Sequence, residues 1–220
     1  MGSSPFRLPF DKLPSILPIF PLANAVVMPG CQLPLNIFEP RYITMTFDAM
    51  GSARLIGMVQ PDSGAEQDNP PPVFRTGTAG RITSYSETQD GRLLVVLSGV
   101  CRFDIRDEVP CDRGYRRVLV DWSRFRADLE PSANVNVDRN RLAALLKNYF
   151  ERKGMETNWN VLNQMPLPIL LNVLTSQLPL NPPERQVLVE TVTFEQRAAR
   201  LCELLRFDVA GIVVADTTRH

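Results

Sequence analysis

The pattern of apolar residues changes once along this chain, near residue 128, and that change limits the folds open to it. Before this point, proline, glycine and asparagine interrupt short apolar runs, a pattern typical of β-strands and turns. After it, apolar residues recur at the spacing of an amphipathic helix. The sequence therefore predicts an α+β protein, with a β-rich domain over 14–128 and a helical subdomain over 135–210. Residues 130–134 are expected to link the two.

Turn residues and alternation place the strands of the first part. Besides two short apolar runs near the start, we expect strands at 54–60, 76–85, 92–97, 101–106 and 116–125. The Asp90-Gly91 pair predicts a hairpin turn. Leu33, Leu35 and Ile37 alternate with polar residues and with Pro34, which predicts a strand at the edge of a sheet because proline has no N–H to donate. The polar segment 61–72 is expected to be an exposed loop.

Capping signals define the helices of the second part. One helix carries Leu142, Leu145, Leu146, Tyr149 and Phe150 at helical spacing and should stop at Gly154; a second, mostly apolar helix should cover 167–178. Two more starts are marked by Asn181-Pro-Pro-Glu and by the capping box Thr193-Phe-Glu-Gln. We expect these helices to pack as a small bundle.

Composition excludes several classes of function. The 220 residues include 24 basic and 24 acidic side chains, so no net charge attracts nucleic acid or an anionic membrane. The chain is 44% hydrophobic and 22% charged, as in ordinary globular proteins. No apolar run is long enough to span a bilayer, and the first residues lack the apolar core of a signal peptide. We therefore expect a cytoplasmic protein without a membrane partner.

The residues that would carry catalysis or bind a metal are scattered. Cys31, Cys101, Cys111 and Cys202 form no C-x-x-C pair, and the single histidine, His220, is the last residue. A structural zinc site needs clustered ligands, and a catalytic triad needs a positioned imidazole. There is also no phosphate-binding glycine motif that opens a helix. We predict no catalytic, metal-binding or cofactor-binding residue and no cofactor, and hence a protein that is not an enzyme.

The sequence F-E-P-R-Y at 38–42 brings an acid, a base and two aromatic residues to one element junction. Pro40 suits the first turn of a helix, and Glu39 complements the positive end of that helix. Arg41 is expected to pair with a nearby carboxylate, and Tyr42 is expected to point inward if Phe38 does. No nucleophile or histidine stands beside this junction, so we interpret it as a structural joint between a strand and a helix.

One basic segment is a candidate for binding nucleic acid. Arg113, Arg116, Arg117 and Arg124 are interleaved with Tyr115, Trp122 and Phe125, an arrangement that can follow a phosphate backbone and stack bases. The neutral charge of the chain and the ordinary strand pattern of Val118 and Val120 argue against it. RNA binding therefore stays as the alternative, and nucleic acid is not the expected partner.

A series of short segments occurs in an order that is more specific than any one of them. They are L-P-I-F-P-L at 17–22, V-M-P-G at 27–30, L-P-L-N-I-F-E-P-R-Y at 33–42, G-T-A-G-R-I at 77–82, D-G-R at 90–92, G-V-C-R-F at 99–103, L-P-L at 178–180 and E-R-Q-V-L-V-E at 184–190, followed by Arg197 and Leu201. The series resembles the N-terminal substrate-binding domain of the Lon protease family over nearly the whole chain. Asn36 departs from the family pattern, where histidine is common.

This resemblance implies a PUA-like β pseudo-barrel followed by a helical bundle. It also implies a non-enzymatic module that grips protein substrates, an adaptor or chaperone-like factor in protein quality control, because the residues after Phe207 leave no room for the ATPase and Ser-Lys protease modules of Lon. Unfolded or flexible polypeptides are the expected partners, and a separate ATP-dependent protease is a further candidate partner. Binding is expected in an apolar groove between the two parts, whose residues the sequence does not identify.

Overall fold

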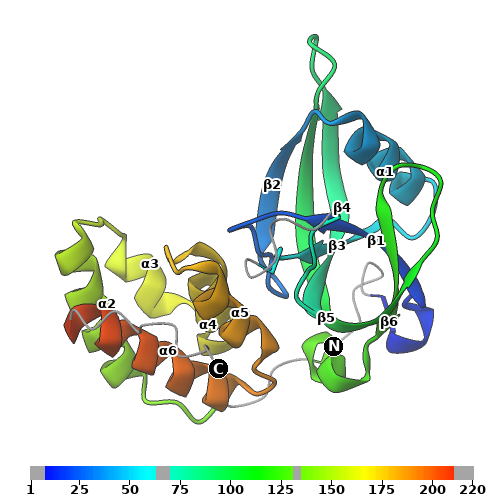
Figure 1. Cartoon of the computed structure of the whole chain (residues 1–220). Coiled ribbons are helices and arrows are strands. Elements are labelled where there is room, and N and C mark those ends of the chain that lie inside the picture. Colours follow the sequence, from blue (N-terminus) through cyan, green and yellow to red (C-terminus); the bar gives the residue numbers. More distant parts are fainter. Residues whose placement is uncertain (1–7, 63–69, 131–134, 211–220) are drawn as a thin grey trace, which may run out of the picture.

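The computed structural model describes residues 8–62, 70–130 and 135–210. A β-sheet lies beside a group of helices from the second part of the chain, and one earlier helix packs on the sheet away from that group (Figure 1). Four of the segments discussed above lie wholly or partly outside the described residues: the N-terminal heptapeptide, the centre of the 61–72 loop, residues 131–134 of the linker, and His220.

Six strands form one sheet. They are β1 (Ile16–Pro21), β2 (Gln32–Ile37), β3 (Leu55–Val59), β4 (Thr76–Glu87), β5 (Leu93–Val109) and β6 (Arg116–Asp121). Their order is β2-β5-β4-β3-β1-β6, and β5 also pairs with β6. Only the β1–β3 pairing of this sheet is parallel. β2 ends the strand order, which confirms the edge position predicted from Pro34.

One long strand replaces two that the sequence predicts separately. The segments 92–97 and 101–106 belong to the single strand β5, so the predicted break between them is wrong. Gly99 lies in this strand where it crosses the turn at 28–31: its N–H donates to the carbonyl of Cys31 (2.9 Å), and its carbonyl accepts from Gly30 (3.0 Å). A side chain at Gly99 would collide with the carbonyl of Met28. Glycine therefore permits a close crossing here and does not end the strand.

The predicted strand 116–125 is too long. β6 ends at Asp121, whose carboxylate accepts hydrogen bonds from the backbone N–H and the hydroxyl of Ser123 at 2.8 and 2.6 Å. These two bonds start the 3-10 helix η3 (Ser123–Leu129). An aspartate that bonds the backbone two residues ahead favours a turn over a continued strand.

Five helices follow in the described chain: α2 (Arg139–Lys153), α3 (Trp159–Gln164), α4 (Leu167–Gln177), α5 (Pro182–Glu190) and α6 (Phe194–Ala210). The predicted stop of α2 at Gly154 is confirmed, with a left-handed φ of 63°. The capping box at Asn181 is confirmed in both directions. At Thr193, the hydroxyl accepts from the N–H of Gln196 (3.2 Å). The short α3 was not predicted.

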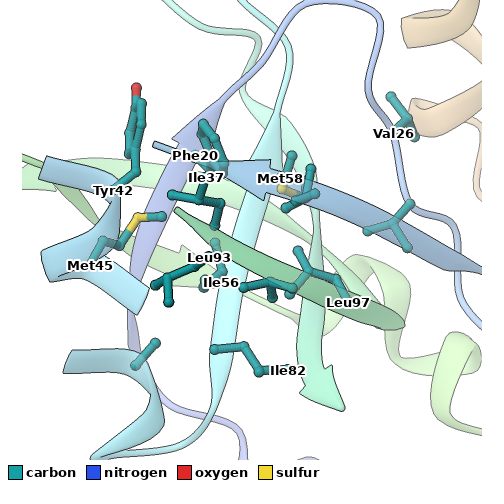
Figure 2. Packing of buried hydrophobic residues seen from close by; sticks show 14 of the residues in the cluster. Phe20, Val26, Ile37, Tyr42, Met45, Ile56, Met58, Ile82, Leu93 and Leu97 are labelled. Atoms are coloured by element: carbon teal, nitrogen blue, oxygen red, sulfur yellow. The ribbon is translucent and has the colours of Figure 1, made fainter. Parts of the chain in front are cut away.

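The core divides along the same lines as the chain. One cluster is centred on the sheet part and includes Phe20, Ile37, Met45, Ile56 and Leu97 (Figure 2). It also takes in Val189 of α5. A second joins the outer helices to one another through leucines such as Leu146, Leu171 and Leu201. Each part therefore buries most of its own apolar side chains, and Val189 adds an apolar contact between the two parts.

The segment 38–42 is a joint between β2 and the helix α1 (Pro40–Met50), as predicted. Tyr42 is buried and packs on Phe20, with 4.2 Å between the ring centroids. Phe38 is 62% exposed, so Tyr42 points inward although Phe38 does not. They fall on opposite sides because the chain turns from strand to helix between them. Arg41 pairs with Glu39.

Candidate functional site

A large cavity lies where the sheet part meets the helices. Its volume is about 1120 Å³, which is more than a single small ligand needs. Its walls come from β4, β5 and the Pro29-Gly30 turn on one side, from η3 on another, and from the first half of α4 with Phe194 of α6 on a third. Val100, Leu129, Leu167, Ile169 and Phe194 give it an apolar lining. The cavity thus has the position expected for a groove between the two parts.

Beside the cavity, Arg102 of β5 connects the sheet to the helices. Its side chain is almost fully buried and forms a two-pronged ion pair with Asp128 of η3, with distances of 2.9 Å from Nε and 2.8 Å from Nη2 to the carboxylate. The remaining guanidinium hydrogens reach the carbonyls of Val189, Thr191 and Val192 at the end of α5. A buried charge is tolerated when its partners are this complete.

Arg197 of α6 extends the same contact. It is 1% exposed and donates to the carbonyls of Leu188 and Thr191 and to the side-chain oxygen of Asn172 on α4. Asn172 in turn donates to the carbonyl of Pro29 in the sheet part (2.9 Å). Burial, and next the charge of Arg102, lower the pKa of Arg197 to about 9, which leaves it charged at neutral pH. We call Arg102, Asp128, Arg197 and Asn172 the buried network.

Further hydrogen bonds join the two parts along α5 and α4. Gln60 donates to Gln186 (3.0 Å), and Gln186 donates to the carbonyl of Thr76 (3.0 Å). Arg185 donates to the carbonyl of Asn24 (2.6 Å), and the N–H of Met28 donates to Ser176 (3.2 Å). These directional bonds fix the helices relative to the sheet, and the wall of the cavity follows from that placement.

The cysteines of the described chain are free thiols, and two of them are buried. Cys31 and Cys101 are buried, and burial raises the pKa of the Cys31 thiol and raises that of Cys101 to about 12. Protonated, buried thiols are poor nucleophiles. Within the residues that the structure describes, no three His, Cys, Asp or Glu side chains gather as a metal site would require. Over the same ranges, no helix has the length and apolar character to cross a membrane.

Three of the four arginines proposed for RNA binding are paired with carboxylates. Arg113 pairs with Asp48, Arg116 with Glu108, and Arg124 with Asp104. The aromatic residues between them, Tyr115, Trp122 and Phe125, are buried. Stacking on bases needs exposed rings, and phosphate contacts need available cations. Nothing in this arrangement favours the RNA-binding alternative.

Comparison with known proteins identifies the family. The family model for the ATP-dependent protease La (LON) substrate-binding domain matches residues 16–206. The chain belongs to the Lon substrate-binding domain family. The family expected from the sequence segments is thereby confirmed.

Two curated relatives of this Lon substrate-binding domain are Lon proteases. The chain is 27% identical over 199 residues to the Lon protease of Parabacteroides distasonis, covering 89% of this chain and 24% of that protein. It is 27% identical over 201 residues to the Lon protease of Flavobacterium johnsoniae, covering 90% of this chain and 24% of that protein. The chain therefore spans about a quarter of the length of these relatives.

Solved structures show the same fold. A Lon N-terminal domain protein from Xanthomonas campestris superposes with a TM-score of 0.62 at 24% identity, covering 86% of this chain and 97% of that one. The N-terminal domain of a Mycobacterium avium complex Lon protease gives a TM-score of 0.58 at 13% identity, covering 90% and 100%. The Lon N-terminal domain fold, a β-sheet plus helices, is thus shared.

Sequence reasoning found the region of the cavity but none of its residues. Arg102 lies in the G-V-C-R-F segment and Arg197 in the last helix, and both contribute to the family resemblance. Their role in joining the two parts depends on partners far away in the chain, such as Val189 for Arg102. An arginine inside an apolar strand is the one local signal that could have indicated a buried ion pair.

Proposed function

We propose that this chain is a non-enzymatic polypeptide-binding module, an adaptor or chaperone-like factor in protein quality control, and that the cavity takes segments of unfolded or flexible polypeptide. The observation that carries the proposal is the partly apolar cavity of about 1120 Å³ in a member of the Lon substrate-binding domain family. A cavity of this size accommodates several side chains of an extended segment. We also propose a separate ATP-dependent protease as a partner. The proposed location of the protein is the cytoplasm.

We also propose the division of the chain into a β-domain over 14–128 and a helical subdomain over 135–210. We interpret the sheet as a PUA-like pseudo-barrel. The last strand in the order, β6, also pairs with β5, the second strand in the order. This pairing supports the interpretation, because it closes β5, β4, β3, β1 and β6 into a ring. RNA binding is not proposed, since no observation favours it.

The test is a binding titration with two matched variants. The probe is a fluorescently labelled, reduced and carboxymethylated protein that cannot fold. Ile169 lines the cavity and is 37% exposed, and Val187 on α5 is 46% exposed away from the cavity. Ile169→Gln is expected to weaken binding about tenfold, the loss that follows from one apolar contact of this size, whereas Val187→Gln leaves binding unchanged.

Two results would contradict the proposal. The first is no binding of any unfolded polypeptide at micromolar concentration by the folded wild-type protein. The second is an equal effect of both substitutions, which would place the binding surface elsewhere. Circular dichroism of each variant establishes that the fold is intact, because both positions are exposed and glutamine suits a helix.

A further inference from the structure

The described chain begins at the wall of the cavity. Leu8 is its first described residue, and it lines the cavity together with Val100 and Leu129. All three also pack against an apolar cluster that contains Phe125. Residues 1–7, which lie outside the described residues, therefore join the described structure at the cavity itself. We call residues 1–7 the N-terminal segment.

The chain that follows Leu8 is held beside η3. The 3-10 helix η1 (Phe10–Lys12) comes next, and the guanidinium of Arg126 lies over the ring of Phe10, 4.7 Å from its centroid. The indole N–H of Trp122 donates to the carbonyl of Pro14 (2.9 Å). These contacts hold the start of the described chain on the η3 side of the cavity, so the N-terminal segment is attached at a fixed point.

The residues before Leu8 suit a partly apolar cavity. Their sequence is S-P-F-R at 4–7, so Phe6 stands two positions before Leu8. Leu8 precedes Pro9, which favours an extended backbone, and in an extended chain residues two apart lie on the same side. An extended chain spans about 3.3–3.6 Å per residue, so Phe6 lies within about 7 Å of Leu8. An aromatic ring is therefore tethered within reach of the cavity.

The residues at the other end of the chain are not tethered in the same way. Phe194, the first residue of α6, lines the cavity, and α6 runs from there to Ala210. With a rise of 1.5 Å per residue, the end of α6 lies about 24 Å from Phe194. Residues 211–220 therefore start far from this part of the wall, which favours the N-terminal segment as an occupant.

A short tether makes even a weak contact effective. A group attached to the wall of a site is present there at an effective concentration on the order of millimolar. A phenylalanine ring gains by leaving water for an apolar surface such as that of Leu167 and Ile169, which line the cavity. A free polypeptide at micromolar concentration would have to displace this ring before it could bind.

We infer that the N-terminal segment is an internal competitor for the cavity, with Phe6 bound against the α4 wall and displaced when a polypeptide segment binds. The docking of Phe6 is argued from the position of Leu8 at the cavity. Its effect on polypeptide binding rests on the proposed function. The two parts of the inference are tested by different measurements.

The docking is tested with 4-fluorophenylalanine incorporated at position 6 of the full chain. Broadening of the fluorine signal by a soluble gadolinium chelate measures the exposure of the ring, and the chain in urea gives the fully exposed reference. We expect the label to be protected in the folded chain, to become exposed in Ile169→Gln, and to stay protected in Val187→Gln. Saturation with the unfolded probe protein should expose it as well.

Three results would overturn the docking. The first is a label as open to the chelate as in urea. The second is an equal effect of Ile169→Gln and Val187→Gln, because Val187 does not line the cavity. The third is protection that appears only at high protein concentration, which would mean that the segment enters the cavity of a second copy.

The competition is tested by the affinity for the fluorescently labelled, reduced and carboxymethylated protein. Phe6→Ser removes the ring and should strengthen binding about fivefold, whereas Phe6→Trp keeps an aromatic ring and should not. Phe38→Ser is the matched control, because Phe38 is an exposed aromatic residue that does not line the cavity, and it should leave the affinity unchanged. Circular dichroism establishes that each variant is folded.

The outcomes distinguish this inference from the proposed function. If the wild type and Phe6→Ser bind the probe equally well, polypeptide binding stands and the competition is refuted. If neither binds it, the proposed function fails and the competition fails with it, while the fluorine signal still decides whether Phe6 docks. Tighter binding by Phe6→Ser than by the wild type and Phe38→Ser, together with a protected label, is the result that supports the whole inference.

Discussion

The sheet and the helices meet in two adjacent regions of opposite character. In the buried network, Arg102 and Arg197 fill the space between the parts with charged hydrogen bonds. At the cavity, the same two parts leave between them a space of about 1120 Å³. Asp128 and Asn172 belong to both regions, since they hold the two arginines and also line the cavity.

This difference explains how the cavity stays open. Burial of apolar surface is favourable by about 25 cal/mol per Å², so an apolar cavity between two movable parts would tend to close. Hydrogen bonds have fixed lengths and directions, and the buried network therefore sets the spacing of the helices from the sheet. We conclude that the network is a main source of stability at this interface, and that the cavity is left free to bind.

The largest effect on stability is expected at the centre of the buried network, which is the filled region of this interface. Arg102→Met removes the partner of buried Asp128 and leaves three carbonyls near the end of α5 without their donor. Breaking a buried pair from one side typically costs about 3–5 kcal/mol of unfolding free energy. Urea denaturation followed by circular dichroism measures the loss. Polypeptide binding should fall as well, since the helices lose their fixed position.

A matched arginine tests whether burial is the reason. Arg113 makes an equally direct pair with Asp48, yet its side chain is 54% exposed. Arg113→Met should change the stability little, because water replaces the lost partner. If Arg102→Met and Arg113→Met had similar effects, the filled region would not be what holds the parts together.

Local signals and distant contacts differ in what the sequence reveals about this fold. Pro40, Gly154 and Asn181 set helix ends through their own backbone chemistry, and the structure confirms all three. The break predicted between the strands 92–97 and 101–106 is wrong, because Gly99 between them allows a close approach to the carbonyl of Met28 in another segment.

The candidate site was beyond local reading for the same reason. The bond from Asn172 to Pro29 joins residues 143 positions apart, and the arrangement of α4 over the sheet depends on it. The family resemblance supplied the fold and the kind of ligand to expect. Which side chains line the cavity follows only from how the two parts dock.

A smaller loss is expected where the filled region borders the cavity. Asn172→Leu keeps the volume of the side chain but leaves the carbonyl of Pro29 and one donor of Arg197 without partners. Unsatisfied buried groups cost roughly 1–3 kcal/mol each, and partial relaxation into the cavity should keep the total loss of unfolding free energy at about 2 kcal/mol. Hydrogen exchange should accelerate in α4 and α6 more than in the sheet.

The exposed Asn163 on α3 supplies the comparison for this substitution. Asn163→Leu introduces the same side chain without breaking a contact between the parts, so it should leave exchange in α4 and α6 as in the wild type. Uniform acceleration across the sheet and helices of Asn172→Leu would instead show that the two parts unfold as one unit, and that the bond to Pro29 does not control their separation.

The smallest effect concerns η3, which carries Asp128 into both regions. Hydrogen bonds from Ser123, and then a hydrogen bond from Arg106, lower the pKa of Asp121 from 3.8 to about 2. Because the folded pKa lies below the unfolded one, the carboxylate stabilises the fold above about pH 4, and this contribution disappears as the pH falls from 4 to 2. Solvent screening at this partly exposed site limits this contribution to about 1 kcal/mol.

Asp121→Asn should therefore be less stable than the wild type at neutral pH and nearly equal to it near pH 2. Urea denaturation across this range measures the difference, and Asp112→Asn is the control for removing one negative charge. A difference that stayed constant with pH would mean that the Arg102–Asp128 pair alone positions η3, and that the start of this segment contributes nothing to either region.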